Sequence, residues 1–276
     1  IYKGSLKTTN FQLGKFLEIE NEVGTISMDA NIEGQGLELK DIEAKLRGNV
    51  QHVVVKGYDY HNVHVKGLFK NKIFNGFMSV EDENIDFDFN GLVDFSGQLP
   101  KMNFQSYINK AKLAKLHFIE DKGLNTNFAM HLDVDMVGNS IDNLVGTIDV
   151  TSLRLTDIED DIRVKHILVK SEAKGKVKKL SVESDMMNGY LEGEYNFKNL
   201  FDASANNFTA YFPSFQSNKY EGVKINNDFS FDLTIFESDL LSKLFLGGVD
   251  FSKNTSLKGY YHSGEQTLSV KGIFPN

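Results

Sequence analysis

The sequence predicts an all-β protein built from antiparallel strands. Three observations indicate this: apolar and polar residues alternate along several segments, Phe and Gly are frequent, and segments with a helical period are scarce. The chain of 276 residues contains 22 Phe, 23 Gly and only 3 Pro. Phe favours strands, and Gly marks their bends and turns. Alternation is typical of antiparallel sheets with one solvated face, whereas doubly covered parallel strands are continuously apolar.

Three segments show the alternation most clearly. In each, every second side chain is apolar and most of the side chains between are polar. Successive side chains of a strand point to opposite faces, so the apolar members of each segment share one face. They are Ile85, Phe87 and Phe89; Phe128, Met130, Leu132 and Val134; and Phe229, Phe231, Leu233 and Ile235.

Weaker alternation, with turn residues between the segments, predicts further strands. They are residues 24–33, 37–47, 51–56, 60–66, 74–80, 143–150, 161–170, 176–183, 189–197, 208–212, 255–261 and 266–273. The total of about fifteen strands or more is well above the four to six that are usual for one sheet.

Helix is expected at one place, residues 238–246. Leu240, Leu241 and Leu244 fall on one helical face there, Ser238 can cap the start, and Gly247 can end the helix. Residues 104–116 fit neither period well, and we expect a loop or short helix followed by a strand. No linker divides the chain, so residues 1–276 are predicted to be one continuous segment with a soft division near 119–123.

Composition excludes several classes of function. The chain has 30 Lys and Arg against 38 Asp and Glu, a net charge of -8. This argues against nucleic acid as the main partner and against adhesion to anionic headgroups.

The absence of Cys excludes disulfides, thiol catalysis and Cys-based zinc sites. No apolar run approaches the length of a membrane-spanning helix. Because the chain begins with Ile, we expect it to be a section of a longer protein.

No catalytic or metal-binding motif is present, so the sequence predicts a protein that is not an enzyme and needs no cofactor. His52, His61 and His64 lie near one another in sequence, but residues three apart on a strand point to opposite faces. Residues 86–91 copy the first half of a calcium-binding EF-hand loop, yet its twelfth position is Gly97 instead of Glu. Both patterns are better interpreted as the solvated faces of strands.

The apolar strand faces need a cover. A second sheet, closure into a barrel or an apolar partner that is not protein can each provide it. The scarcity of predicted helix excludes a helical layer. The sequence pattern alone leaves these three solutions open.

Several short motifs resemble the TamB/AsmA-like family of bacterial envelope proteins. They are Phe11-Gln-Leu-Gly14, Val23-Gly-Thr-Ile26, Ile32-Glu-Gly-Gln-Gly36, the strand pair at 56–67, and the segments 74–87 and 91–96. The form is closest to members from Bacteroidota, and it covers about residues 10–118 well. Glu83 stands where the family usually has Pro, which affects one turn.

The resemblance implies a long, U-shaped antiparallel β-groove, or β-taco, whose concave side is apolar. The alternating residues from Ile85 to Ile235 would then be the groove lining. The function implied is transfer of phospholipids between the inner and outer membranes, in the periplasm. The expected partners are phospholipids, a BamA/TamA-type barrel, and the inner membrane through an N-terminal anchor outside this chain, with no nucleic acid.

Other functions remain open at this stage. A scaffold or adaptor for assembly of outer-membrane barrel proteins would pair its strand edges with a partner by β-augmentation. A β-sandwich that binds glycans is a third possibility, although the chain has no Trp to serve as a platform. A hydrolase with a Ser or Thr nucleophile is the least supported.

Overall fold

The computed structural model describes residues 1–36, 41–118, 126–156, 161–197, 227–238, 251–265 and 267–275. These residues form one short helix and fifteen strands. The helix is α1 (Leu13–Leu17). The strands are β1 (Tyr2–Gln12), β2 (Val23–Gln35), β3 (Glu43–Val55), β4 (Tyr58–Lys70), β5 (Ile73–Glu81), β6 (Ile85–Asp94), β7 (Lys101–Ala111), β8 (Asn127–Val137), β9 (Val145–Thr156), β10 (Asp161–Lys174), β11 (Val177–Ser184), β12 (Met187–Glu194), β13 (Asp228–Ile235), β14 (Thr255–His262) and β15 (Thr267–Ile273).

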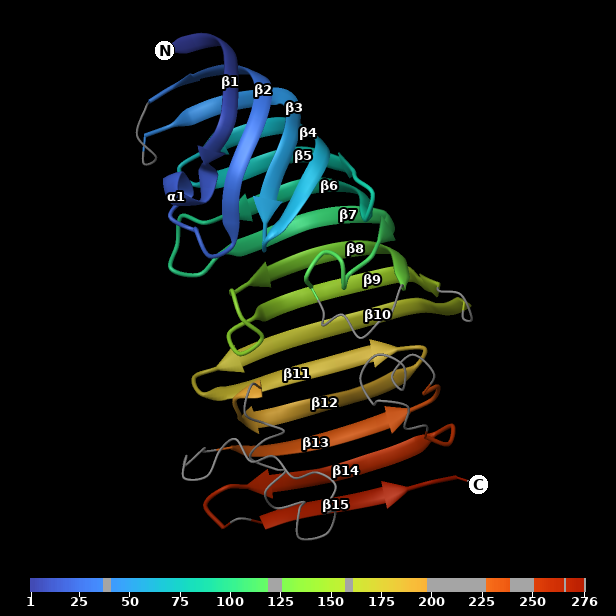
Figure 1. Ribbon diagram of the computed structural model, residues 1–276. Helices are drawn as coiled ribbons and strands as arrows, with labels where there is room; N and C mark the ends of the chain where they lie inside the picture. The colour runs from blue at the N-terminus through green and yellow to red at the C-terminus, as the bar shows by residue number, and fades with distance from the viewer. Residues whose placement is uncertain are drawn as a thin grey trace. The chain divides into compact units, whose positions relative to one another are not determined.

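The fifteen strands belong to one antiparallel sheet and follow one another in chain order, from β1 to β15 (Figure 1). Each strand from β2 to β14 therefore pairs with the strand before it and the strand after it. Such sequential pairing needs only short connections. The prediction of an all-β, antiparallel fold is confirmed.

The chain divides into two compact units. Unit 1 comprises Ile1–Val137 and Asp149–Arg163, and unit 2 comprises Gly138–Ile148 and Val164–Asn276. Unit 1 contains β1–β8, and unit 2 contains β11–β15 and most of β10. The two units are described separately below.

The long strands at the start of unit 1 are bent along their length (Figure 1). Bulges accompany the bend: the pairing of β1 with β2 shifts between Thr8 and Phe11, and the pairing of β2 with β3 shifts after Ser27. Asn10 and Asn62 take positive φ angles of 50° and 52°. Asn tolerates this left-handed conformation better than most residues, and a bulge increases local bending and twist.

The structure corrects two sequence-based expectations. Residues 104–116 do not begin with a loop or helix, because β7 runs through Ala111. The four-residue spacing of Phe104 and Ile108 resembled a helix, but Met102 and Ser106 complete an alternating strand face. The strands expected at 37–47 and 51–56 are one strand, β3, since Gly48 pairs with both neighbours and does not form a turn.

Two further elements were not predicted from the sequence, β1 and α1. The helix expected at 238–246, the strand at 208–212 and the soft division near 119–123 lie outside the described residues. In the part of the chain that the structure describes, α1 is the only α-helix.

Candidate functional site

One face of the sheet in unit 1 is predominantly apolar. Residues that pair across antiparallel strands share a face, so the strand registers define rows of side chains that run across β1–β8. Four such rows contain no charged residue. They are Thr8–Met28–Val50–Val63–Val80–Phe87–Ile108–Met130; Leu6–Ala30–Gly48–Val65–Met78–Phe89–Ser106–Leu132; Gly4–Ile32–Leu46–Gly67–Gly76–Gly91–Phe104–Val134; and Tyr2–Gly34–Ala44–Phe69–Phe74–Val93–Met102–Met136.

The structure places the predicted lining residues of unit 1 on this apolar face. Phe87 and Met130 share one row, and Phe89 and Leu132 share the next. Ile85 pairs with Ala111, which in turn pairs with Phe128, and these three lie one row further along the strands. Ile85, Phe89, Phe128 and Val134 are buried, whereas Phe87, Met130 and Leu132 are half-buried.

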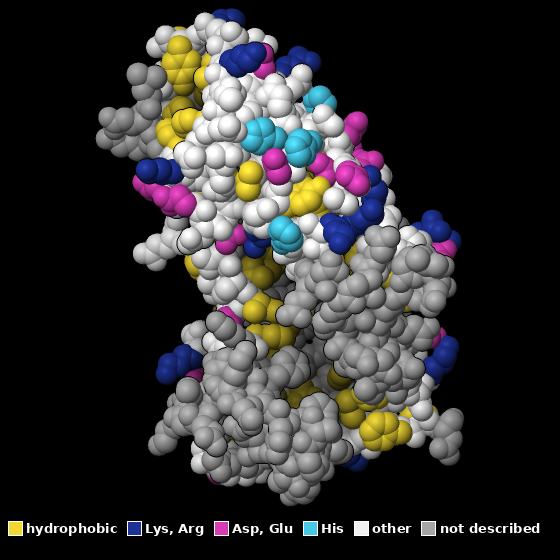
Figure 2. Space-filling model, in the orientation of Figure 1, with side chains coloured by type: hydrophobic (Ala, Val, Ile, Leu, Met, Phe, Trp, Pro, Cys, Tyr) yellow, Lys and Arg dark blue, Asp and Glu magenta, His cyan; other side chains and the backbone are white. Residues whose placement is uncertain are grey.

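The face contains further residues that the sequence analysis did not select. Val50, Val63 and Val80 are each at most 4% exposed and are neighbours in one row. They lie outside the three segments of clearest alternation, from which the lining residues were selected. Figure 2 shows hydrophobic side chains reaching the surface over the first strands of unit 1, at the upper left.

Aromatic rings line the middle of the apolar face. The ring centroids of Phe89 and Phe104 are 4.9 Å apart, and those of Phe74 and Phe89 are 6.3 Å apart. The ring of Phe74 lies against Gly67 on the neighbouring strand, where a Cβ atom would be 2.7 Å from the ring. Glycine on one strand therefore lets an aromatic side chain of the next strand lie flat on the sheet.

Unit 2 presents a second apolar face, which contains the remaining predicted residues. Phe229 pairs with Tyr261, Phe231 with Leu191, and Leu233 with Leu257. Ile235 and Phe229 are buried, whereas Phe231 and Leu233 are half-buried. Tyr195, Phe229 and Tyr261 form a buried cluster against which Leu191, Phe197, Phe231 and Leu268 pack.

A single charged residue lies in the rows of the unit 2 apolar face. Lys178 pairs with Gly193, and its ammonium group lies 4.4 Å from the ring centroid of Tyr195 and 3.2 Å from a carboxylate oxygen of Asp142. The same carboxylate accepts the backbone N–H of Phe197 at 2.5 Å. Burial, followed by the charge of Asp142, raises the pKa of Tyr195 to about 12. The ion pair and the cation–π contact thus satisfy Lys178 inside an apolar surrounding.

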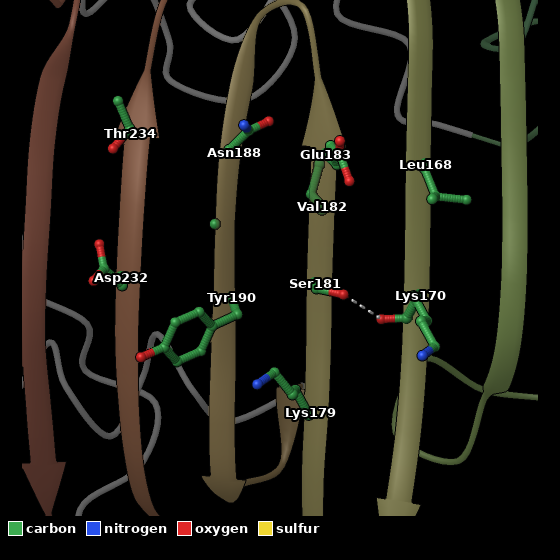
Figure 3. A pocket seen from close by; sticks show the side chains of 11 residues that line it. Leu168, Lys170, Lys179, Ser181, Val182, Glu183, Asn188, Tyr190, Asp232 and Thr234 are labelled. Atoms are coloured by element: carbon green, nitrogen blue, oxygen red, sulfur yellow. Dashed lines mark hydrogen bonds between the residues drawn. The ribbon is translucent and has the colours of Figure 1, made fainter.

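The opposite face of unit 2 is polar and carries a shallow depression of about 430 Å³ over β10–β13 (Figure 3). Three of its four charged side chains form ion pairs: Lys170 with Glu172 at 2.9 Å, Lys179 with Glu192 at 3.0 Å, and Asp232 with Lys258, on the neighbouring strand, at 3.0 Å. Ser181 donates a hydrogen bond to the backbone oxygen of Lys170. Among the described residues, the structure shows no hydrogen bond between this hydroxyl and a side chain that could act as a base.

A polar cluster in unit 1 centres on Asp82, which is 9% exposed. Its carboxylate accepts hydrogen bonds from the Tyr58 hydroxyl, the His61 backbone N–H and the Asn84 backbone N–H, and it contacts His61 Nδ1. Burial alone would raise the pKa of Asp82, but the hydrogen bonds from Asn84, Tyr58 and His61 outweigh burial and lower it. Lys110 donates to the backbone oxygen of Asp82, which connects the cluster to β7.

Two of the histidines near this cluster share a carboxylate: Asp59 lies 3.1 Å from His52 and 3.7 Å from His61. The other side of the His52 ring contacts Asn10. His61 contacts Asp82, and His64 contacts Asn49. Figure 2 shows histidines beside acidic side chains in the upper part of the view. Within the described ranges, no group of three or more His, Asp or Glu side chains is arranged to hold a metal ion.

No family model matches the chain, and comparison with curated proteins and solved structures also found no match. The class of the chain is therefore given by its fold. It is an all-β protein with a sequentially paired antiparallel sheet. None of the helices described is long and apolar enough to cross a membrane.

Proposed function

We propose that the apolar faces bind the acyl chains of lipids, and that the chain is a segment of a protein that transfers phospholipids in a bacterial envelope. The observation that carries this proposal is the set of four uncharged rows across eight strands of unit 1. Neighbouring strands are about 4.8 Å apart, so the rows extend roughly 34 Å. The periplasmic location, the barrel partner and the membrane anchor belong to the same proposal and rest on the resemblance of motifs.

The chemistry of the rows suits an acyl chain. Moving a methylene group out of water contributes about 0.8 kcal/mol, so a long chain gains from continuous apolar contact and needs no specific polar partner. The half-buried side chains of Phe87, Met130 and Leu132 keep part of their surface available for such contact. A headgroup would remain in solvent, since these rows offer it no charge.

The first test measures lipid that co-purifies with the chain. We expect native mass spectrometry and lipid extraction of protein purified without detergent to detect bound phospholipid. The Phe87→Glu, Phe231→Glu double variant should retain at most about a tenth of this lipid, because a carboxylate in the apolar row is costly to desolvate. Tyr107→Glu is the matched control: Tyr107 is 53% exposed and lies on the other face of β7, so its lipid content should not change.

Circular dichroism of the same proteins separates a lipid site from an ordinary core. A folded double variant without lipid supports the proposal. A lipid-free wild-type chain, or a double variant that unfolds while Tyr107→Glu stays folded, would mean that the rows are a closed core.

A further inference from the structure

The polar face of unit 1 contains an unusual pairing of like charges. Arg47 on β3 and Lys66 on β4 are directly opposite each other in the register of the two strands. Directly opposed residues have Cβ atoms about 5 Å apart, and like charges at that spacing destabilise a sheet. Both side chains are exposed, and neither forms an ion pair with any residue that the structure describes.

A second pair of opposed cations shows how the sheet compensates such repulsion elsewhere. Lys258 and Lys271 are opposite each other on β14 and β15 of unit 2. Lys258 is neutralised by Asp232, whose carboxylate oxygen lies 3.0 Å from the ammonium nitrogen. The interaction with Asp232 also raises the pKa of Lys258. Arg47 and Lys66 have no such carboxylate, so their charges are left for a ligand to neutralise.

The surface around Arg47 and Lys66 is hollowed. Two adjoining depressions, of about 780 and 650 Å³, both include Arg47, Lys66 and Asn31 in their linings. Together the linings contain four cations, Lys3, Lys45, Arg47 and Lys66, against two acids, Asp29 and Glu33, and Glu33 is bound to Lys3 at 3.1 Å. The linings therefore have a local charge of +2, which is opposite in sign to the net charge of the chain, -8.

We propose that Arg47 and Lys66 bind a phosphate group on the polar face of unit 1. The guanidinium of Arg47 offers a planar fork of donors that matches two phosphate oxygens, and the Lys66 ammonium adds a point charge on the neighbouring strand. Asn31 pairs with Arg47 in the sheet, so its amide is positioned on the same side as a further donor. Phe77, which pairs with Lys66 and is 41% exposed, offers an apolar surface to the group that carries the phosphate.

This site is independent of the proposed acyl-chain site. It lies on the opposite face of the same strands, and its residues alternate with those of the apolar rows. The phosphate can come from a free phosphate compound or from a phospholipid headgroup in a membrane, and both sources present the same chemistry. Loss of lipid from the apolar face therefore says nothing about phosphate binding here.

The test is calorimetric titration of the whole chain with inorganic phosphate at low, matched ionic strength. We expect the Arg47→Gln, Lys66→Gln double variant to bind at least about ten-fold more weakly than wild type, because it loses both charged donors. The matched control is Lys258→Gln, Lys271→Gln, which removes the other opposed pair and should bind phosphate as wild type does. In the absence of phosphate, Arg47→Gln, Lys66→Gln should have an equal or higher Tm, since a repulsion is removed.

Flotation with vesicles identifies the source of the phosphate. Binding to phosphatidylglycerol vesicles but not to phosphatidylcholine vesicles, lost in Arg47→Gln, Lys66→Gln, would assign the site to an anionic headgroup. Phosphate binding without vesicle binding would assign it to a soluble phosphate compound. Undetectable binding of both probes, or equal binding by wild type and both double variants, overturns the proposal.

Discussion

Replacing Gly91 with alanine is expected to lower the free energy of unfolding by about 3 kcal/mol. Gly91 lies in the middle of β6 with a φ angle of 152°, in a region that side chains rarely adopt. A Cβ atom there would lie 2.4 Å from both the backbone oxygen of Asn103 and the Cα atom of Phe104. These atoms belong to the backbone of β7, so β6 and β7 would have to separate to admit the methyl group.

Gly4 provides the control for this prediction, because it lies in the same row of the apolar face. A Cβ atom at Gly4 would meet no other atom within 4 Å. Gly4→Ala should therefore change stability by less than about 0.5 kcal/mol. Urea denaturation monitored by circular dichroism measures both variants. Equal stability of Gly91→Ala and wild type would contradict the close approach of β6 and β7 at this point.

The three most regular strands of the fold could be predicted from the sequence almost to their ends. In β6, β8 and β13, nearly regular alternation of apolar and polar residues leaves only one pairing that puts most apolar side chains on one face. The prediction was wrong at β7, where Phe104 and Ile108 are four residues apart and imitate a helical turn. Pairing with β6 and β8 on both sides decides in favour of the strand, because the local sequence is compatible with both periods.

The candidate sites could be predicted only in part. Alternation identifies which side chains share a face within one strand, and the eleven predicted residues do so. The rows across strands depend on register, and bulges such as the one beside Asn10 change register without a clear sequence signal. The opposition of Arg47 and Lys66 likewise depends on the register of β3 and β4, which the sequence pattern alone does not fix.

Replacing Asp82 with asparagine is expected to destabilise the chain by about 2 kcal/mol at neutral pH. The Asp82 carboxylate, whose side chain is 4% exposed, accepts hydrogen bonds from Tyr58, His61 and Asn84. Asparagine has the same shape but is uncharged, and its amide nitrogen would face donors instead of offering them an acceptor. The hydrogen bonds that hold the start of β4 against the turn before β6 would therefore weaken.

The pH dependence of this effect distinguishes the charge of Asp82 from its shape. The pKa of Asp82 is lowered in the folded chain, so the unfolded chain binds more protons at low pH and stability rises with pH. The contribution is complete above the unfolded pKa of about 3.9 and is lost as pH falls through the folded value. Wild type and Asp82→Asn should therefore differ most at neutral pH and converge as pH falls through the lowered pKa of Asp82. Asp135→Asn, at an exposed position on β8, is the control and should follow wild type throughout. A difference between wild type and Asp82→Asn that stays constant down to pH 2 would show that the amide disrupts packing and that the charge contributes nothing.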